Sequence, residues 1–367
     1  MRRNDFLPTP PKSNPELRWK PAIATISLGA ANLHSITAKI NAAAQNSQEG
    51  IELFHDDLAQ LAQTLRGKTL SDDAQTRTDR EYEIDAAHAI HDLCAEKGLR
   101  ILALQPFRHY EGLIDREEHA KRLDELQHWV SLCKILGDSL FILIPSSFLD
   151  ESQTTGDRDV IVSDLAEAAD LAYPVRIAYE ALAWGTHINT WEDCWDMVVK
   201  ADRPNLGICL DTFNIAARIW ADPLSATGRL PAHADTDLQV SMERLVKEVD
   251  PSRVMMVQLA DGERVDPSEP FLRAPGLHPL LAWSRNARLF PCEEERGGFL
   301  PIREVTDACL NGVGYSGWVS MEVFSRTLGD ERPEVPREHA ERAGRSWQRV
   351  LGMLEAKAGE KGEKVTV

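Results

Sequence analysis

The sequence predicts a single α/β domain, a (β/α)8 TIM barrel, and three observations support this fold class. Eight apolar segments of strand length alternate with about eight amphipathic segments of helical length. Such strand–helix–strand units give parallel strands, and eight of them close into a barrel. No strand is followed by a glycine-rich phosphate loop such as GxGxxG, which disfavours the competing open, doubly wound sheet. Polar residues end several of the strands, as they do at the active-site rim of a barrel.

The expected elements follow from apolar patterning in chain order. Each strand is a nearly continuous apolar run, which is typical of a strand buried on both faces. Each helix has apolar residues at helical spacing, and Gly98 and Gly137 end two of them in the usual way. The expected strands span residues 21–29, 50–55, 99–105, 139–144, 175–180, 206–211, 253–259 and 317–324. The expected helices span residues 35–46, 58–65, 82–97, 115–136, 157–171, 190–201, 237–249, 301–310 and 337–354.

The remaining segments are expected to lie outside the regular barrel. Residues 1–19 are rich in proline, asparagine and charge, which predicts a mobile tail. Residues 20–355 form the barrel domain, and residues 356–367 are expected to be a disordered tail. After the seventh strand, residues 261–298 are interrupted by five prolines. We expect a long loop there, and such loops are usually lids or binding loops.

Composition narrows the classes of partner. The 367 residues are 43% hydrophobic and 27% charged, which is typical of a globular protein. Lys and Arg total 41 against 58 Asp and Glu, so the net charge of −17 disfavours a nucleic-acid partner. No apolar run approaches the ~20 residues of a membrane span, and the N-terminus lacks a secretory apolar region. Six scattered cysteines without a CxxC pair indicate reduced thiols in a cytosolic protein. We expect a small-molecule substrate. The sequence leaves open whether the protein forms a homo-oligomer.

A site for one divalent cation is predicted where four strands end. Glu180, Asp211, Gln258 and Glu322 end the fifth, sixth, seventh and eighth strands. Neighbouring strands lie about 4.8 Å apart, so these side chains can meet on one ion. Their oxygens suit Mg²⁺, Mn²⁺ or Co²⁺ better than Zn²⁺, which favours His and Cys. In the alternative interpretation, each residue pairs with an arginine or caps a helix. Four such residues at the ends of neighbouring strands favour a metal site instead.

Cationic and imidazole side chains follow two other strands. His55 follows the second strand and is a candidate general base, because histidine titrates near neutral pH. Its alternative is a helix-capping or surface histidine. Arg108 and His109 follow the third strand, and Arg108 can bind a substrate carboxylate through two hydrogen bonds. His109 is a second, weaker candidate for the base.

Four further residues are predicted to bind substrate. Gln105 ends the third strand, and Asn214 lies three residues after Asp211, where it can bond a substrate oxygen or turn the chain. Trp184 can form an apolar wall with other aromatic side chains, although aromatic residues more often lie in the core. Arg285, in the long loop, can close over an anion, although loop arginines such as Arg285 and Arg288 are more often solvated.

Six segments carry a family resemblance. They are GIELFHDDL, LQPFRHYEGLIDREEH, RIAYEALAW, RPNLGICLDTFNIA, LLAWSRNARLF and GWVSMEVFSR. They resemble the fungal 3-dehydroshikimate dehydratases of quinate catabolism, which belong to the xylose-isomerase-like TIM barrel superfamily. The resemblance covers about residues 20–355. It implies one divalent metal on Glu180, Asp211, Gln258 and Glu322, and substrate binding by Arg108. Bacterial members have a histidine at the position of Asn214, so the family's proton-transfer group is absent here and His55 is the candidate to replace it.

The resemblance implies a dehydration. A base removes the proton on C4 of 3-dehydroshikimate, the metal stabilises the enediolate, and the C5 hydroxyl leaves as water to give protocatechuate. The main alternative is a ketose isomerase or 3-epimerase, in which Glu180 and Glu322 act as opposed acid and base. An endonuclease on this fold would need several zinc ions and a basic groove. A non-catalytic barrel would bind no metal at the four positions.

Overall fold

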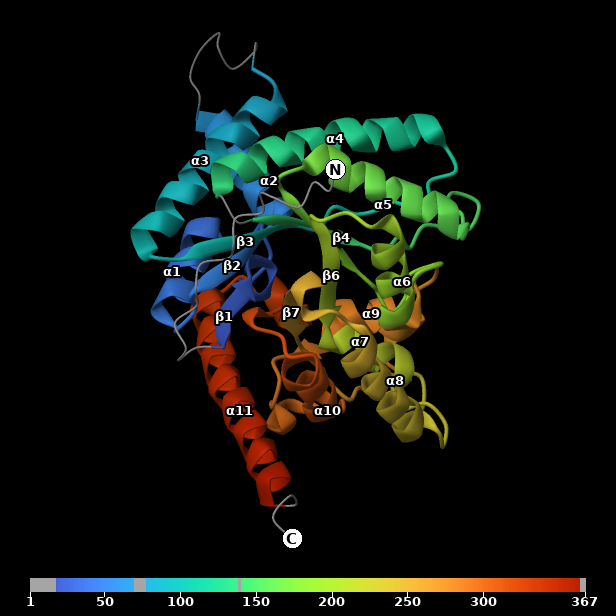
Figure 1. The fold of residues 1–367 in the computed structure, drawn as a ribbon. Helices are drawn as coiled ribbons and strands as arrows, with labels where there is room; N and C mark the ends of the chain where they lie inside the picture. Colours follow the sequence, from blue (N-terminus) through green and yellow to red (C-terminus); the bar gives the residue numbers. More distant parts are fainter. Residues whose placement is uncertain (1–17, 69–76, 138–139, 364–367) are drawn as a thin grey trace.

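Eight parallel strands form a closed barrel, which confirms the predicted fold class. The computed structural model describes residues 18–68, 77–137 and 140–363, with side chains described up to residue 356. The strands follow one another around the barrel in the order β1-β10-β7-β6-β5-β4-β3-β2. Helices surround the strands, and the long C-terminal helix α11, red in Figure 1, extends beyond the barrel.

Most predicted elements are present within a few residues of their expected bounds. The barrel strands are β1 (Trp19–Ala24), β2 (Gly50–Phe54), β3 (Arg100–Gln105), β4 (Phe141–Pro145), β5 (Arg176–Glu180), β6 (Leu206–Asp211), β7 (Val254–Leu259) and β10 (Gly317–Met321). The helices are α1 (Ile36–Gln45), α2 (His55–Lys68), α3 (Asp79–Lys97), α4 (Arg116–Leu136), α5 (Arg158–Ala172), α6 (Trp191–Ala201), α7 (Thr212–Ile219), α8 (Ala234–Glu248), α9 (Pro279–Ala287), α10 (Ile302–Asp307) and α11 (Val335–Glu363).

Local sequence signals fix several helix ends. Thr78 caps α3 through a reciprocal capping box with Glu81, and Gly98 ends that helix in the left-handed conformation. Asp115 caps α4 by accepting hydrogen bonds from two backbone N–H groups of the first turn. No helix within the described ranges is long and apolar enough to cross a membrane.

The barrel contains two separate apolar layers, because successive side chains of a strand face opposite sides. One set packs between the strands and the helices, and it includes Ile51 and Leu53 of β2. The other set fills the barrel interior and includes Ala103, Phe141 and Met256. The interior is therefore a packed core, and inward-facing residues at the carboxyl ends of the strands lie at its rim.

The two predicted tails are only partly tested. Residues 1–17 lie outside the described residues, but Trp19 already belongs to β1, so the predicted boundary at residue 19 is slightly late. The prediction of a disordered tail from residue 356 is wrong in part, because α11 continues to Glu363. Residues 364–367 lie outside the described ranges.

The segment 261–298 is more ordered than predicted. It contains α9 and two short strands, β8 (Asp261–Gly262) and β9 (Arg288–Leu289), which pair antiparallel. The prolines misled the prediction: Pro279 occupies the first turn of α9, where its missing N–H is not needed. Asp261 fixes the far end by accepting hydrogen bonds from the backbone N–H groups of Phe299 and Leu300. The segment is therefore a structured lobe over the rim.

Candidate active site

Three acidic side chains converge at the carboxyl end of the barrel. Glu180 and Asp211 are the last residues of β5 and β6, and Glu322 directly follows β10. One oxygen of each lies within 4.8 Å of the others, and all three residues are at most 4% exposed. The strand-end prediction therefore brought together residues that are up to 142 positions apart in the sequence.

Gln258, the fourth predicted ligand, lies beside this cluster. It pairs with Asp211 in the β6–β7 ladder and with Ser320 in the β10–β7 ladder. Its amide nitrogen donates a hydrogen bond of 2.8 Å to Glu52, and its oxygen lies 3.3 Å from the donating thiol of Cys209. The side chain is completely buried, directly beneath the rim.

A buried arginine sits among the acids. Arg288, from β9, donates from Nη1 to Asp211 Oδ2 at 2.8 Å and to Glu322 Oε2 at 3.1 Å. Its Nε donates to the Ser284 hydroxyl at 2.9 Å, and its guanidinium lies over the ring of Phe213. Arg288 is 1% exposed, so the expectation of a solvated loop arginine is wrong. The apolar run of α9 anchors the preceding turn and carries Arg288 inward.

The acidic cluster is under-neutralised. Burial and the neighbouring Glu322 and Asp211 raise the pKa of Glu180 well above its usual value. Burial and Asp211 also raise the pKa of Glu322 to about 7, against the opposing effect of Arg288. One guanidinium balances one of three carboxylates. Hard oxygen donors with excess negative charge fit a divalent cation, which would satisfy both coordination and charge.

Asn214 organises the acids. Its Nδ2 donates to Glu180 Oε1 at 2.9 Å and to Asp211 Oδ2 at 2.7 Å. Its oxygen accepts a hydrogen bond from the backbone N–H of Ala183. These bonds use the amide within the protein, and direct contact of Asn214 with a substrate stays a prediction. Asp211 also caps α7 through the N–H groups of Phe213 and Asn214, so the helix-capping and arginine-pairing roles of the alternative interpretation are both present.

A pocket opens above the cluster. It is lined by Phe54, Gln105, Pro106, Arg108, Pro145, Phe148, Glu180, Leu182, Trp184, Leu281, Ser284, Arg285, Arg288, Glu322 and Phe324. The predicted substrate residues Gln105, Arg108, Trp184 and Arg285 therefore all reach it. Trp184 Nε1 is buried there without a hydrogen-bond partner. A buried donor of this kind is usually satisfied by a ligand or a water.

Two cations mark one side of the pocket. Arg108 is half-buried and Arg285 is exposed. Within the described ranges neither side chain pairs with a carboxylate, and Arg108 is near enough to lower the pKa of Arg285, together with burial. Two like charges placed together without an acidic partner favour an anion between them.

The structure does not bring the two predicted bases into the pocket wall. His55 is the first residue of α2, and its ring stacks on Trp129 with centroids 4.7 Å apart. Its Nε2 lies 3.3 Å from Glu83, between the helices. His109 contacts Phe148 from behind that wall. Burial and the nearby arginines lower the pKa of His109 to about 4, so its ring is a weak base near neutral pH.

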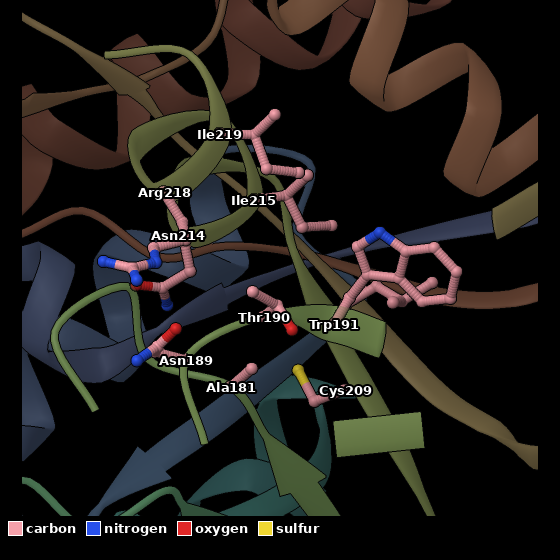
Figure 2. Close-up of a pocket in the computed structure, with 10 residues that line it drawn as sticks. Ala181, Asn189, Thr190, Trp191, Cys209, Asn214, Ile215, Arg218 and Ile219 are labelled. Atoms are coloured by element: carbon pink, nitrogen blue, oxygen red, sulfur yellow. The ribbon is translucent and has the colours of Figure 1, made fainter. Parts of the chain in front are cut away.

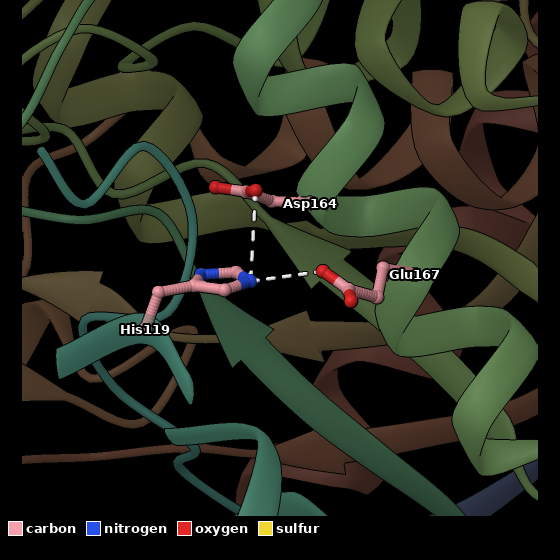
Figure 3. Close-up of side chains that lie close together, drawn as sticks. All are labelled: His119, Asp164 and Glu167. Carbon is pink, nitrogen blue, oxygen red and sulfur yellow. Dashed lines mark hydrogen bonds and ion pairs between the residues drawn. The ribbon is translucent and has the colours of Figure 1, made fainter. Parts of the chain in front are cut away.

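Two other features do not extend the site. A small pocket is lined by Ala181, Asn189, Thr190, Trp191, Cys209, Asn214, Arg218 and neighbouring apolar residues (Figure 2). Its volume of about 10 Å³ holds at most one water. A cluster of His119, Asp164 and Glu167 joins α4 to α5 (Figure 3). Arg116 and the backbone N–H of Gly112 already bond the Asp164 carboxylate, so this cluster anchors the loop before α4.

Sequence reasoning missed Glu52 altogether, and it named Arg288 without the role that the structure gives it. Glu52 is fully buried, although it lies in the middle of the apolar strand β2. A charge inside such a run was an available signal, because a buried carboxylate needs partners. Arg288 gave a weaker signal, since only the apolar run before it in α9 indicates burial.

Comparisons with known proteins agree with this geometry. The chain is 44% identical over 345 residues to a 3-dehydroshikimate dehydratase of Neurospora crassa, and the match covers 90% of this chain and 93% of that protein. A solved xylose isomerase-like TIM barrel/4-hydroxyphenylpyruvate dioxygenase fusion protein superposes with a TM-score of 0.69 at 24% identity, over 94% of this chain and 44% of that chain. The solved IolI protein, which holds a zinc atom, superposes with a TM-score of 0.65 at 17% identity, over 90% of this chain and 98% of that one.

The two solved structures support the fold alone. The model of one family, described as the xylose isomerase-like TIM barrel, matches residues 40–350 of the sequence. Together with the extent of the Neurospora match, this result shows that the chain belongs to the xylose isomerase-like TIM barrel family.

Proposed function

We propose that this chain is a hydro-lyase that dehydrates 3-dehydroshikimate to protocatechuate. The observation that carries the proposal is one pocket with acidic cation ligands at its base and, at its side, two arginines that pair with no carboxylate of the described residues. The named activity of the Neurospora relative supports the same substrate. A ring that bears a carboxylate at one end and a ketone with an adjacent hydroxyl at the other matches both halves of this pocket.

The substrate is held at both ends. Arg108 and Arg285 bind its carboxylate, with Arg108 deeper and Arg285 at the mouth. Trp184 and Phe148 contact the ring, and the unpartnered Trp184 N–H is available to a substrate oxygen. These contacts direct the ketone and the C4 hydroxyl toward Glu180 and Glu322. Glu180 and Glu322 are buried at strand ends, so this end of the pocket is pre-organised.

A divalent cation belongs to the same site. Glu180, Asp211 and Glu322 would hold it, with the Gln258 oxygen as the fourth ligand, and Mg²⁺, Mn²⁺ and Co²⁺ are the candidates. When bound, the cation supplies Lewis-acid stabilisation for the negative charge that develops on the substrate oxygens.

Glu180 is the proposed general base. Of the pocket-lining side chains, only Glu180 and Glu322 are carboxylates, and Arg288 is hydrogen-bonded to Glu322 but not to Glu180. Glu180 accepts a hydrogen bond from Asn214 at Oε1, and its side chain lines the pocket. It removes the C4 proton, Glu322 is placed to assist departure of the C5 hydroxyl as water, and loss of a C6 proton with protonation of the C3 oxygen gives the aromatic product.

Incubation with 3-dehydroshikimate, with the catechol absorbance followed in the ultraviolet, tests the proposal. Wild-type protein should form protocatechuate with added Mg²⁺, Mn²⁺ or Co²⁺, and a chelator should abolish turnover. Glu180→Gln should lose at least about a thousandfold in kcat, because it removes both a ligand and the base. Product formation by Glu180→Gln at the wild-type rate would reject the assignment. Absence of product from the wild type, with isomerisation of a ketose instead, would favour the 3-epimerase alternative, which leaves the two arginines without a role.

A further inference from the structure

Glu52 occupies an unusual place for a carboxylate. It lies in the middle of β2, faces the barrel interior, and is 0% exposed. Within the described ranges, no lysine or arginine pairs with it. Instead its Oε2 accepts two hydrogen bonds from amides, from Gln105 Nε2 at 2.7 Å and from Gln258 Nε2 at 2.8 Å. Its Oε1 makes no hydrogen bond of good geometry within the described ranges, although the Ser320 hydroxyl is close enough to this carboxyl to oppose the rise that burial causes in its pKa.

This bonding pattern fixes how Gln258 can present its amide. Oε2 of Glu52 lies between two amides and accepts from both, so Gln258 turns its NH₂ group toward Glu52 and its oxygen away. The Cys209 thiol, 3.3 Å from that oxygen, supports the same orientation. A glutamine ligates a cation through its oxygen, so the orientation favoured by Glu52 is the one that a cation needs. Without an acceptor at residue 52, the weak thiol donor of Cys209 would be left to hold this orientation.

We propose that Glu52 is a positioning residue for the divalent cation: it holds Gln258 with its oxygen available as a ligand, and it ties Gln258 to Gln105 on the pocket wall. The inference rests on the proposed cation site. Glu52 does not line the pocket, so it acts through Gln258 and Gln105 rather than on the substrate. Hydrogen-bond partners of this kind set the orientation of metal ligands, and their loss typically weakens metal affinity 10- to 100-fold, as a rough guide.

Calorimetric titration of the full chain with Mn²⁺ tests this role without reference to turnover. Glu52→Leu removes the acceptor and should bind Mn²⁺ roughly 10- to 100-fold more weakly than the wild type. Glu52→Asp keeps a carboxyl group but withdraws it from the two amides, so it should also lose about tenfold or more. Glu111→Gln is the matched control, because Glu111 is also a buried acid, but its carboxylate accepts from the Ser147 backbone N–H and the Tyr179 hydroxyl rather than from Gln258. Its affinity should stay within about twofold of the wild type.

The outcomes separate the position of the acceptor from the mere presence of a carboxyl group. Weak binding by Glu52→Leu with wild-type binding by Glu52→Asp would mean that a carboxyl group at any distance from the amides suffices, and would overturn the positioning role. Unchanged affinity in both variants would overturn it as well. If Glu52→Leu fails to fold by circular dichroism, Glu52→Asp alone decides the question. If the wild type binds no Mn²⁺, the cation site itself fails, and the positioning role fails with it while the substrate assay still stands.

Discussion

Replacement of Arg288 by methionine tests whether the site is built around an excess of buried negative charge. The side chain is 1% exposed and bonds two carboxylates, Asp211 at 2.8 Å and Glu322 at 3.1 Å. Removing one partner of a buried ion pair costs about 3–5 kcal/mol, because the remaining charge is left uncompensated. We therefore expect Arg288→Met to lower the free energy of unfolding by about 3–5 kcal/mol at pH 8 in the presence of a chelator.

A divalent cation should restore much of this loss. A cation at a hundred times its dissociation constant stabilises a folded protein by about 2.7 kcal/mol. The cation should stabilise Arg288→Met more than it stabilises the wild type, because no guanidinium competes with it for Asp211 and Glu322. Urea unfolding followed by tryptophan fluorescence, with a chelator and with Mn²⁺, measures both quantities.

The matched control is another buried arginine, one that does not line the pocket. Arg342 is 7% exposed and bonds Glu293 through two nitrogens, at 2.8 and 2.7 Å. Arg342→Met should destabilise the protein by a similar amount, yet gain no more from Mn²⁺ than the wild type. Equal stabilisation of all three proteins by Mn²⁺ would refute the reasoning, and so would an Arg288→Met protein as stable as the wild type in the chelator.

Three further predictions concern single residues. Burial raises the pKa of Glu111 to about 7 in the folded protein. Between about pH 4.5 and 7 the folded state therefore binds more protons than the unfolded state. The free energy of unfolding falls as pH rises through that window. Glu111→Gln should remove on the order of 3 kcal/mol of this fall, measured by urea unfolding across the window; an unchanged slope would contradict the assignment. Arg108→Met should raise KM for 3-dehydroshikimate roughly 10- to 100-fold with a smaller change in kcat, because a charge-assisted hydrogen bond to the substrate is lost. An unchanged KM would show that Arg108 does not bind the substrate carboxylate. His55→Gln should leave kcat within about twofold, since its ring lies on Trp129, and a tenfold loss would restore it as a base.

The strand-end residues could be predicted because a parallel barrel converts sequence position into location. Glu180, Asp211 and Glu322 each end an apolar run, and the barrel topology brings such ends to one rim. The same logic failed for His55, which also follows a strand. Helix α2 begins at His55 itself, so no loop residue intervenes and the ring turns outward onto α4. The position of a residue at a strand end does not by itself decide where its side chain points. The first turn of the following helix decides it.

Residues that act through tertiary pairing were harder to predict. Glu52 belongs to a run that is otherwise apolar, and its partners Gln105 and Gln258 lie 53 and 206 positions away. Arg288 lies in a segment whose prolines suggested a loop, whereas Pro279 starts a helix. In each case the identity of the partner, rather than the local pattern, determines what the charged side chain does. Periodicity carries no information about such partners.

Charge balance connects the stability of this fold to its chemistry. Four buried acids, Glu52, Asp211, Glu180 and Glu322, lie at or just below one rim, and Arg288 is the cation bonded to them within the described ranges. An apolar core gains nothing from this arrangement, because buried carboxylates without enough counter-charge destabilise the folded state. A barrel selected for stability alone would place apolar residues there, as it does one layer below at Phe141 and Met256. The acids are therefore better explained by a cation that completes the set, and the stability of the protein should depend on that cation.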